Sequence, residues 1–305
     1  MTGATGFVGQ WLVRDLEAAE HEVVAAPGRA QLDITDRSAV REMVGTVRPQ
    51  AIAHLAGVSY AGDARDDPGL ALAVNEGGTR VIIEAAARLE APPMVLVTGS
   101  SEVYGHPRPS DLPLRETAPL LADQPYGLPK LAQERAAIET GATLAVPVVV
   151  ARSFNHTGPG QRREFVAPAL VSRVLDAKKS GSVEIVVGNL DVRRDLGDVR
   201  DVVRAYRLLI EGAVSGAIAS GSILNVATGE SISIRDILAI ICDVADISVE
   251  PRVDAGLVRA NDPREIRGDP TELRRITGWA PTIPLPQTLG DLVDSIMAVR
   301  PPISR

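Results

Sequence analysis

Short apolar runs alternate with helix-like stretches through the first half of the sequence. Four runs are rich in Val, Ile or Leu and are bounded by Gly or polar residues: 21–26, 51–57, 93–100 and 145–153. Four stretches carry apolar residues at helical spacing: 9–20, 36–47, 70–90 and 126–140. Because successive strands joined through a helix pair in parallel by right-handed crossovers, this order predicts an α/β fold with a doubly wound parallel sheet of the Rossmann type.

After Arg152 the alternation becomes less regular. The segments that follow are a Gly/Pro-rich stretch, a helix-like segment, a strand-like run and a proline-punctuated region, at 155–161, 165–178, 183–188 and 251–286. We expect this part to form a smaller, mostly C-terminal lobe. The predicted division is a sheet domain of 1–154 with parts of about 198–228, and a second lobe of about 155–197 and 229–305.

The composition predicts a globular protein that acts on small molecules. Hydrophobic residues make up 45% of the 305 residues, and the net charge of -7 argues against a general affinity for nucleic acid or an anionic membrane. No apolar run approaches the ~20 residues of a membrane span. The one cysteine, Cys242, excludes an intrachain disulfide. We therefore expect a cytoplasmic protein without a membrane segment.

The N-terminal sequence TGATGFVG places Gly3, Gly6 and Gly9 directly before a helix-like stretch. Glycine lets the backbone approach a pyrophosphate, and the start of the helix presents unpaired N–H groups and the positive end of its dipole. The pattern favours nucleotide binding over a turn that serves packing alone. The residues expected to line the nucleotide here are Gly3, Thr5, Gly6, Phe7, Val8 and Gly9.

A second pattern predicts acid–base chemistry. Tyr126 and Lys130 are four residues apart, so on a helix they share one face. A nearby ammonium favours phenolate and lowers the pKa of a tyrosine, which makes it a usable general acid or base. That pair alone is more typical of a solvated helix face. However, TGSSEVYG also places Ser100, Ser101 and Glu102 at the carboxyl end of an expected strand, where doubly wound sheets carry their chemistry.

Five motifs in this order resemble the extended short-chain dehydrogenase/reductase family: TGATGFVG, HLAG (54–57), NEGGT (75–79), SSEVYG (100–105) and YGLPK (126–130). The resemblance implies a nicotinamide cofactor and a catalytic set of Ser100, Tyr126 and Lys130. Tyr126 would donate or accept the proton, and Lys130 would hold the nicotinamide ribose and activate the tyrosine. The further cofactor contacts that it implies are Asp33, Ile34, Leu55, Ala56, Gly57 and Asn75.

Three later motifs are similar to the branch of that family that handles GDP-linked 6-deoxyhexoses: RSFNHTGPGQ (152–161), VGNLDVRRDLGDVRDVVRAY (187–206) and TGWAP (277–281). The similarity implies substrate binding by Ser101, Asn155, Arg194 and Arg259. Arginine suits a diphosphate because its planar fork donates paired hydrogen bonds. Without the resemblance, DVRRDLGDVRD would be interpreted as a surface of compensating charge, and Asn155 as an ordinary loop residue.

The reaction expected from this resemblance is reduction of the C4 keto group of a GDP-4-keto-6-deoxyhexose, with Tyr126 as proton donor. In related 4,6-dehydratases a Glu at the place of Glu102 removes a proton, so a dehydratase is an alternative, as is a 4-epimerase. Both would retain their nicotinamide cofactor. A non-catalytic cofactor-binding protein is a third alternative, although a pure binder needs no proton donor. No metal is expected, and the partner is a nucleotide sugar.

The sequence after the second apolar run favours NADP(H) over NAD(H). An Asp or Glu directly after that strand would bind the ribose 2′-hydroxyl of NAD, whereas an arginine can meet a 2′-phosphate. Here the run leads into APGRAQLDITD, whose candidate is Arg29. The alternative is that Arg29 is an exposed loop residue. The family resemblance also implies a homodimer formed through helices, to which the Ala-rich stretch 131–138 would contribute.

The strand before the glycine loop is short. Family members normally begin with a strand of about five residues, whereas only Met1 and Thr2 precede Gly3 here. A missing central strand leaves backbone groups of its neighbours unpaired, at a cost of ~1–3 kcal/mol for each buried group. We therefore expect the natural chain to begin upstream, and an upstream extension to raise stability or cofactor affinity.

Overall fold

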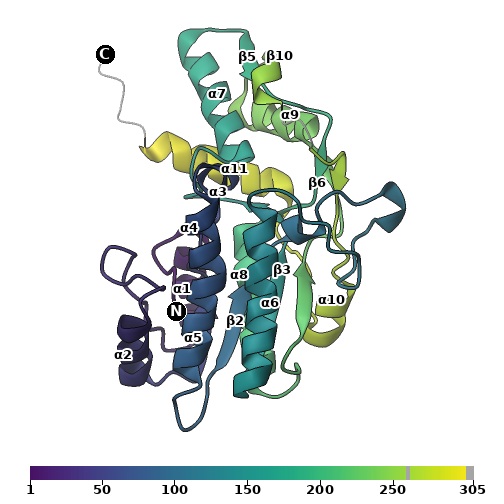
Figure 1. Cartoon of the computed structure of the whole chain (residues 1–305). Coiled ribbons are helices and arrows are strands. Elements are labelled where there is room, and N and C mark those ends of the chain that lie inside the picture. The colour runs from purple at the N-terminus through teal and green to yellow at the C-terminus, as the bar shows by residue number, and fades with distance from the viewer. Residues whose placement is uncertain (259–261, 300–305) are drawn as a thin grey trace.

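The computed structural model describes residues 1–258 and 262–299, and a parallel sheet lies at the centre of its larger lobe (Figure 1). Within these residues the sheet has four strands in the order β1-β2-β3-β8, and each neighbouring pair is parallel. The strands are β1 (Ala51–His54), β2 (Met94–Thr98), β3 (Val148–Ser153) and β8 (Ile223–Val226). This confirms the predicted doubly wound α/β fold, and three of the four runs predicted as strands are strands.

Helices cover both faces of this sheet because its strands are apolar on both sides. Alternate residues of β2 belong to different cores: Val95 and Val97 to one, Met94 and Leu96 to the other. The helices on the Leu96 face are α1 (Phe7–Ala18) and α8 (Val199–Val214). Those on the Val95 face are α2 (Arg37–Val47), α5 (Gly78–Ala86) and α6 (Gly127–Leu144).

One expected strand is absent from the described residues: the run 21–26 forms no regular strand. Among the described residues, Met1 and Thr2 are the ones in place to pair with it. The Met1 amino group donates to the Val24 carbonyl at 2.7 Å, and the Ala26 N–H donates to the Met1 carbonyl at 2.8 Å. On the other side the Thr2 N–H donates to Ala53 O at 3.0 Å. A two-residue partner is too short to hold a ladder along the whole run, so the prediction of a strand there is wrong.

The predicted helix 70–90 consists of three consecutive pieces and ends earlier than expected. They are α4 (Pro68–Leu72), a π-helical turn (Ala73–Gly77) and α5. Pro68 occupies the first turn of α4, and the Asp67 carboxylate accepts from Leu70 N–H at 2.9 Å. A π-helical turn holds one more residue than an α-helical turn, so it changes which side chains face the sheet, and such turns are frequent at functional sites.

The second lobe has its own apolar core, built from residues between Ala167 and Ile296. Three helices contribute to it: α7 (Val166–Ser180), α9 (Ile234–Ala245) and α11 (Leu285–Val299). The remaining strands are β4 (Asn155–Thr157) with β7 (Leu196–Asp198), β5 (Glu184–Val187) with β10 (Glu250–Val253), and β6 (Arg193–Arg194) with β9 (Ile232–Ser233) and β11 (Glu265–Ile266). The remaining α-helices are α3 (Ala61–Asp66) and α10 (Thr271–Thr277).

The helices in the described ranges include none that combines the length and the apolar character needed to cross a membrane.

Candidate active site

Ser100 and Tyr126 lie next to each other where β2 meets α6. Ser100 follows β2 and caps the 3₁₀ turn Ser101–Tyr104, since its Oγ accepts from Glu102 N–H at 3.2 Å. Gly127 begins α6 directly against this turn. Ser100 is also hydrogen-bonded to Tyr126. Two segments that are distant in sequence therefore bring a hydroxyl and a phenol together at the carboxyl end of the sheet, the edge at which doubly wound folds bind ligands.

The pKa of the Tyr126 phenol is raised, which is the opposite of the effect that the spacing of Tyr126 and Lys130 predicts. Burial is the largest cause, and the negative charge of Glu102 adds to it, whereas the hydrogen bond with Ser100 opposes both. The depth of burial outweighs any help from a cation one helical turn away. Tyr126 is therefore protonated throughout the neutral range, which is the state that a proton donor needs.

Lys130 is buried, with 6% of its surface exposed, and its ammonium is held by neutral acceptors. Nζ donates to the Thr98 carbonyl at 2.6 Å and to Oε1 of Gln133. Burial lowers the pKa of Lys130 from 10.5 to about 8, and the charge of Glu134 opposes this shift. A lysine in this condition is still mostly protonated at neutral pH.

Glu134 forms a buried ion pair with Arg152 of β3. The two side chains are 4% and 3% exposed, and their paired hydrogen bonds measure 2.6 and 2.7 Å. Arg152 also donates to the Tyr104 hydroxyl at 3.0 Å and to the Glu116 carbonyl at 2.9 Å. This network ties α6 to the sheet, so the helix that carries Tyr126 has a fixed position.

The glycine loop fits the pyrophosphate of a dinucleotide. Gly3 has a φ of +70°, and a β-carbon there would lie 2.7 Å from Ala56 N. A β-carbon on Gly9 would lie 2.0 Å from Gly3 O. Only glycine permits this packing of the loop against β1 and α1. Gly6 is the N-cap of α1, and no side chain in the described residues caps that end, so the first N–H groups of the helix suit an anion.

Of the other predicted cofactor contacts, Arg29 lies beside this loop. An added β-carbon on Gly28 would lie 3.8 Å from Thr5 Oγ1, which places the 28–29 turn next to the glycine loop, and Arg29 is exposed there. The carboxylate of Asp33 accepts from the N–H and the hydroxyl of Thr35 at 2.9 and 2.7 Å, and these bonds lower its pKa. Ile34 is buried, whereas Phe7 and Val8 are half-buried.

Asn75 clamps the chain that follows β1. Its Oδ1 accepts from Val58 N–H at 2.8 Å, and its Nδ2 donates to Val58 O at 3.1 Å. A β-carbon on Gly57 would lie 2.7 Å from that Oδ1. The buried amide of Asn75 thus shapes the loop through Leu55 and Ala56, which are half-buried beside the glycine loop.

The residues predicted to bind substrate lie in separate places. Ser101 is buried in the turn after β2, and Asn155 is exposed at the start of β4. Arg194 of β6 is paired with Asp262 and donates to the Pro263 carbonyl at 2.9 Å. Arg259 lies outside the described residues.

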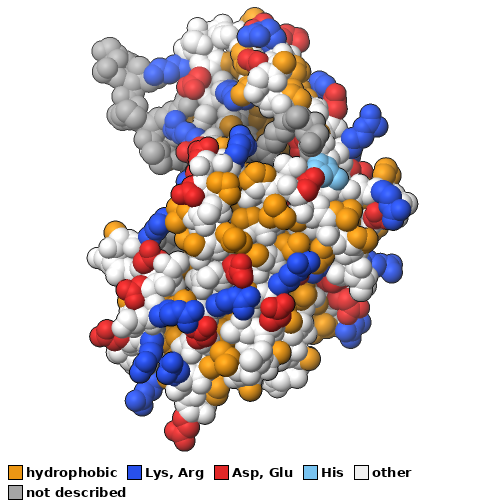
Figure 2. Space-filling model, in the orientation of Figure 1, with side chains coloured by type: hydrophobic (Ala, Val, Ile, Leu, Met, Phe, Trp, Pro, Cys, Tyr) orange, Lys and Arg blue, Asp and Glu red, His pale blue; other side chains and the backbone are white. Residues whose placement is uncertain are grey.

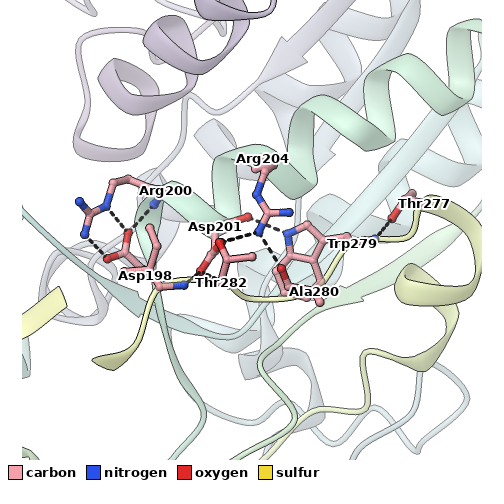
Figure 3. A network of polar contacts seen from close by, with 9 residues as sticks. Asp198, Arg200, Asp201, Arg204, Thr277, Trp279, Ala280 and Thr282 are labelled. Atoms are coloured by element: carbon pink, nitrogen blue, oxygen red, sulfur yellow. Dashed lines mark hydrogen bonds and ion pairs between the residues drawn. The ribbon is translucent and has the colours of Figure 1, made fainter. Parts of the chain in front are cut away.

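The charged run DVRRDLGDVRD contains carboxylates that are buried (Figure 3). Asp198 accepts from the Arg200 guanidinium at 2.9 and 2.7 Å. Asp201 accepts from the N–H and the hydroxyl of Thr282, both at 2.9 Å, while Trp279 Nε1–H donates to the Asp201 carbonyl at 2.9 Å. Asp201 therefore fastens the segment 277–283 to α8, whereas Asp198 pairs with Arg200 at the start of that helix. The charges of these residues compensate one another, but the interpretation of the run as a surface is wrong for Asp198 and Asp201, which are buried.

A buried line of polar side chains behind Lys130 was missed in the sequence. Gln133 joins the Lys130 ammonium to Thr79, and Thr79 contacts His54 of β1. The sequence spacing could have identified Gln133 as a partner of Lys130, because Gln133 lies one helical turn after Lys130 and shares its face.

Comparisons with known proteins identify the family of this chain. The model of the NAD dependent epimerase/dehydratase family matches residues 1–227. GDP-6-deoxy-D-mannose reductase of Pseudomonas aeruginosa is 33% identical over 291 residues, which are 95% of this chain and 93% of that protein. GDP-6-deoxy-D-talose 4-dehydrogenase of Aggregatibacter actinomycetemcomitans is 28% identical over 286 residues, or 91% and 90% of the two chains. The solved structure of RMD from Pseudomonas aeruginosa complexed with NADPH matches with a TM-score of 0.87 at 31% identity, covering 97% of each chain. With its glycine loop, its Ser100–Tyr126 contact and three quarters of its length matched by the family model, this chain belongs to the NAD dependent epimerase/dehydratase family.

Proposed function

We propose that the protein is an NADPH-dependent reductase that converts GDP-4-keto-6-deoxy-D-mannose to GDP-D-rhamnose. The observation that carries this proposal is the hydrogen bond between Ser100 and a protonated Tyr126, at the sheet edge beside a glycine loop shaped for a pyrophosphate. The 33% identity to a GDP-6-deoxy-D-mannose reductase supports the substrate.

In this reaction the chain provides the proton and the orientation. NADPH, when bound, supplies the hydride to C4 of the sugar. The Tyr126 hydroxyl gives its proton to the C4 oxygen, so the carbonyl becomes an alcohol and Tyr126 becomes a phenolate. The Ser100 hydroxyl donates a hydrogen bond to the same oxygen as negative charge develops there. The Lys130 ammonium stabilises the phenolate until a proton returns from solvent.

The two ends of the cofactor would meet different parts of the larger lobe. We assign the pyrophosphate to the glycine loop and the start of α1, and the nicotinamide ribose to Lys130 and Tyr126. Arg29, exposed beside Thr5, is assigned to a 2′-phosphate, which makes NADP(H) the preferred cofactor. The NADPH in the structure of RMD, 31% identical to this chain, supports that assignment.

The smaller lobe would bind the nucleotide sugar. We propose that residues of about 155–197 and 229–305 form this substrate lobe, except for the segment of α10 and Trp279, which packs in the core of the sheet lobe, and that 1–154 with parts of 198–228 bind the cofactor. Asn155, Arg194 and Arg259 are the proposed contacts to the sugar diphosphate. Arg194 is held by Asp262 in this structure, so a diphosphate would have to replace that carboxylate as its partner.

A second candidate function is a 4,6-dehydratase, which Glu102 favours. Glu102 is exposed, and its charge reaches Tyr126 strongly enough to raise the pKa of the phenol. A carboxylate so close to the proton donor would be placed to remove a proton from carbon. The dehydratase, like a 4-epimerase, would return its cofactor to the starting oxidation state in every cycle.

Cofactor consumption separates these functions. NADPH loss is followed by absorbance with GDP-4-keto-6-deoxy-D-mannose, with GDP-mannose and without sugar. Stoichiometric oxidation with the keto-sugar alone supports the reductase, and NMR of the product identifies the configuration at C4. Conversion of GDP-mannose without net oxidation of NADPH would instead assign Glu102 as the base of a dehydratase.

We also propose that the protein works in the cytoplasm as a homodimer. The face shown in Figure 2 gathers hydrophobic side chains over α4, α5 and α6. Leu72 of α4 and Leu128 of α6 are 43% and 50% exposed, and the two helices contact each other. Burial of such residues favours association. Light scattering of the wild type and of the Leu72→Glu, Leu128→Glu double variant tests this interface, since the variant should be a monomer.

A further inference from the structure

A continuous line of buried hydrogen bonds runs from Lys130 to the edge of the sheet. Gln133 Oε1 accepts from the Lys130 ammonium, and Gln133 Nε2–H donates to Thr79 Oγ1 at 3.1 Å. His54 Nε2 lies 3.0 Å from the same Thr79 oxygen, and its Nδ1 lies 2.8 Å from Thr2 Oγ1. All five residues are buried. The line therefore connects α6, α5 and β1 through buried side chains.

The direction of each bond in this line is determined by its neighbours. The Thr79 hydroxyl donates to the Asn75 carbonyl at 2.7 Å, so its lone pairs are left to accept from Gln133 and from His54. His54 therefore carries its proton on Nε2, and Nδ1 accepts from the Thr2 hydroxyl. The Gln133 amide then has one possible orientation, with its NH₂ toward Thr79 and its carbonyl oxygen toward Lys130.

We propose that Gln133 is a positioning residue that fixes the Lys130 ammonium for its contact with the nicotinamide ribose and Tyr126. An ammonium has three donors on a flexible stem. The Thr98 carbonyl and the Gln133 amide oxygen take two of them, which leaves one for the site. This inference rests on the proposed role of Lys130. It adds that the Gln133 amide determines the direction in which the Lys130 ammonium points, and that Thr79 fixes the orientation of that amide.

The charges around this line make Gln133 the adjustable partner of Lys130. The charges that act on this line are Glu134 on α6, which faces Lys130, and the Met1 ammonium, which faces His54 on β1. Arg152 on β3 pairs with Glu134, and Glu102 on the turn after β2 acts on Tyr126, the N-cap of α6. Burial, Lys130 and the Met1 ammonium lower the pKa of His54 to about 3, so its ring is neutral in the working range. Glu134 is already paired with Arg152. A substitution at residue 133, which bonds directly to Lys130, therefore changes the protonation of Lys130 without rearranging an ion pair.

Two substitutions of Gln133 should move the protonation of Lys130 in opposite directions. Gln133→Met removes the acceptor at similar volume, so Lys130 should lose its proton at a pH about one unit lower than in the wild type. Gln133→Glu places a carboxylate beside the ammonium, so the loss should move about one unit higher. The readouts are the dissociation constant of NADPH, measured by fluorescence from pH 6 to 10, and the alkaline limb of kcat.

Three comparisons make this test decisive. Gln287→Met, on an exposed part of α11, should keep the wild-type profiles. Thr79→Val removes the support of Gln133 and should shift the profiles as Gln133→Met does, which provides a second test if a Gln133 variant unfolds. Thermal melting identifies unfolded variants. NADPH binding profiles that coincide with wild type in folded Gln133 variants would overturn the inference, whereas a lack of turnover with every sugar would overturn the proposed reaction and leave the binding test intact.

Discussion

The backbone carbonyl of Glu102 lies so close to Gly127 that a β-carbon at residue 127 would stand 2.7 Å from its oxygen. Through this contact the first turn of α6 rests directly on the turn that follows β2. The packing of the segment that begins with Tyr126 against the turn that follows Ser100 consequently requires residue 127 to lack a side chain.

Gly127→Ala should therefore reduce turnover by displacing α6. A shift of several tenths of an ångström, up to ~1 Å, separates Tyr126 from Ser100, and such displacements lower kcat by up to ~100-fold. Gly45→Ala on α2 is the matched control, because its β-carbon would meet nothing within 4 Å. That control should keep its kcat and gain roughly 0.5–1 kcal/mol of stability. Equal kcat in the two variants would show that the close contact does not position the phenol.

Tyr126→Phe removes the proton donor and leaves the ring in place. We expect kcat to fall by ~10²–10⁴-fold, as for the loss of a general acid, while the NADPH dissociation constant changes little. Stopped-flow measurement of hydride transfer and fluorescence titration of NADPH give the two quantities. A variant with full activity would require another donor, and Glu102 would be the first to test.

Arg29→Ala tests the cofactor preference. If Arg29 meets the 2′-phosphate, the variant should bind NADPH about tenfold more weakly, while its affinity for NADH is unchanged. Arg41→Ala on the exposed part of α2 supplies the control for a general loss of positive charge. Equal losses for NADPH and NADH in Arg29→Ala would contradict the assignment.

His54 makes the fold sensitive to acid. Its pKa is lowered from 6.5 to about 3, mainly by burial, so the unfolded chain binds the proton more tightly than the folded chain. Stability is therefore lost as the pH falls from 6.5 toward 3, at up to ~1.4 kcal/mol per pH unit. Urea unfolding of the wild type and of His54→Gln at pH 7, 6 and 5 measures this effect. The variant should be less stable at pH 7 but should show a shallower decline, and parallel declines would disprove a buried neutral imidazole.

The buried ion pair of Glu134 and Arg152 should be costly to break on one side. Glu134→Gln leaves the guanidinium without its counter-charge, which typically destabilises a fold by about 3–5 kcal/mol. Asp191→Ala removes one partner of the exposed pair with Arg235 and should cost less than ~1 kcal/mol. Denaturant midpoints of the two variants provide the comparison. Similar midpoints would mean that water reaches the inner pair.

The sequence identifies the elements whose patterns are set locally. β1, β2 and β3 are apolar on both faces because helices cover both, and the positions of Tyr126 and Lys130 follow from helical spacing. The run 21–26 fails as a strand because its outcome depends on the length of a distant partner. The burial of Asp198 and Asp201 depends on partners at 200, 282 and 283, which charge pattern does not reveal. The pKa of Tyr126 depends on its depth in the fold, which spacing alone leaves open.

The Trp279 indole has a consequence for how the protein is made. It is 2% exposed within the core of the sheet lobe, together with Leu273, although both residues follow most of the other lobe along the chain. That other core in turn runs from Ala167 to Ile296. During synthesis, the sheet-lobe core is incomplete until Trp279 has emerged from the ribosome, and the other core until Ile296 has emerged. The N-terminal lobe of this protein therefore does not complete its core ahead of the rest, as early domains usually do, because that core includes residues that are made after most of the other lobe.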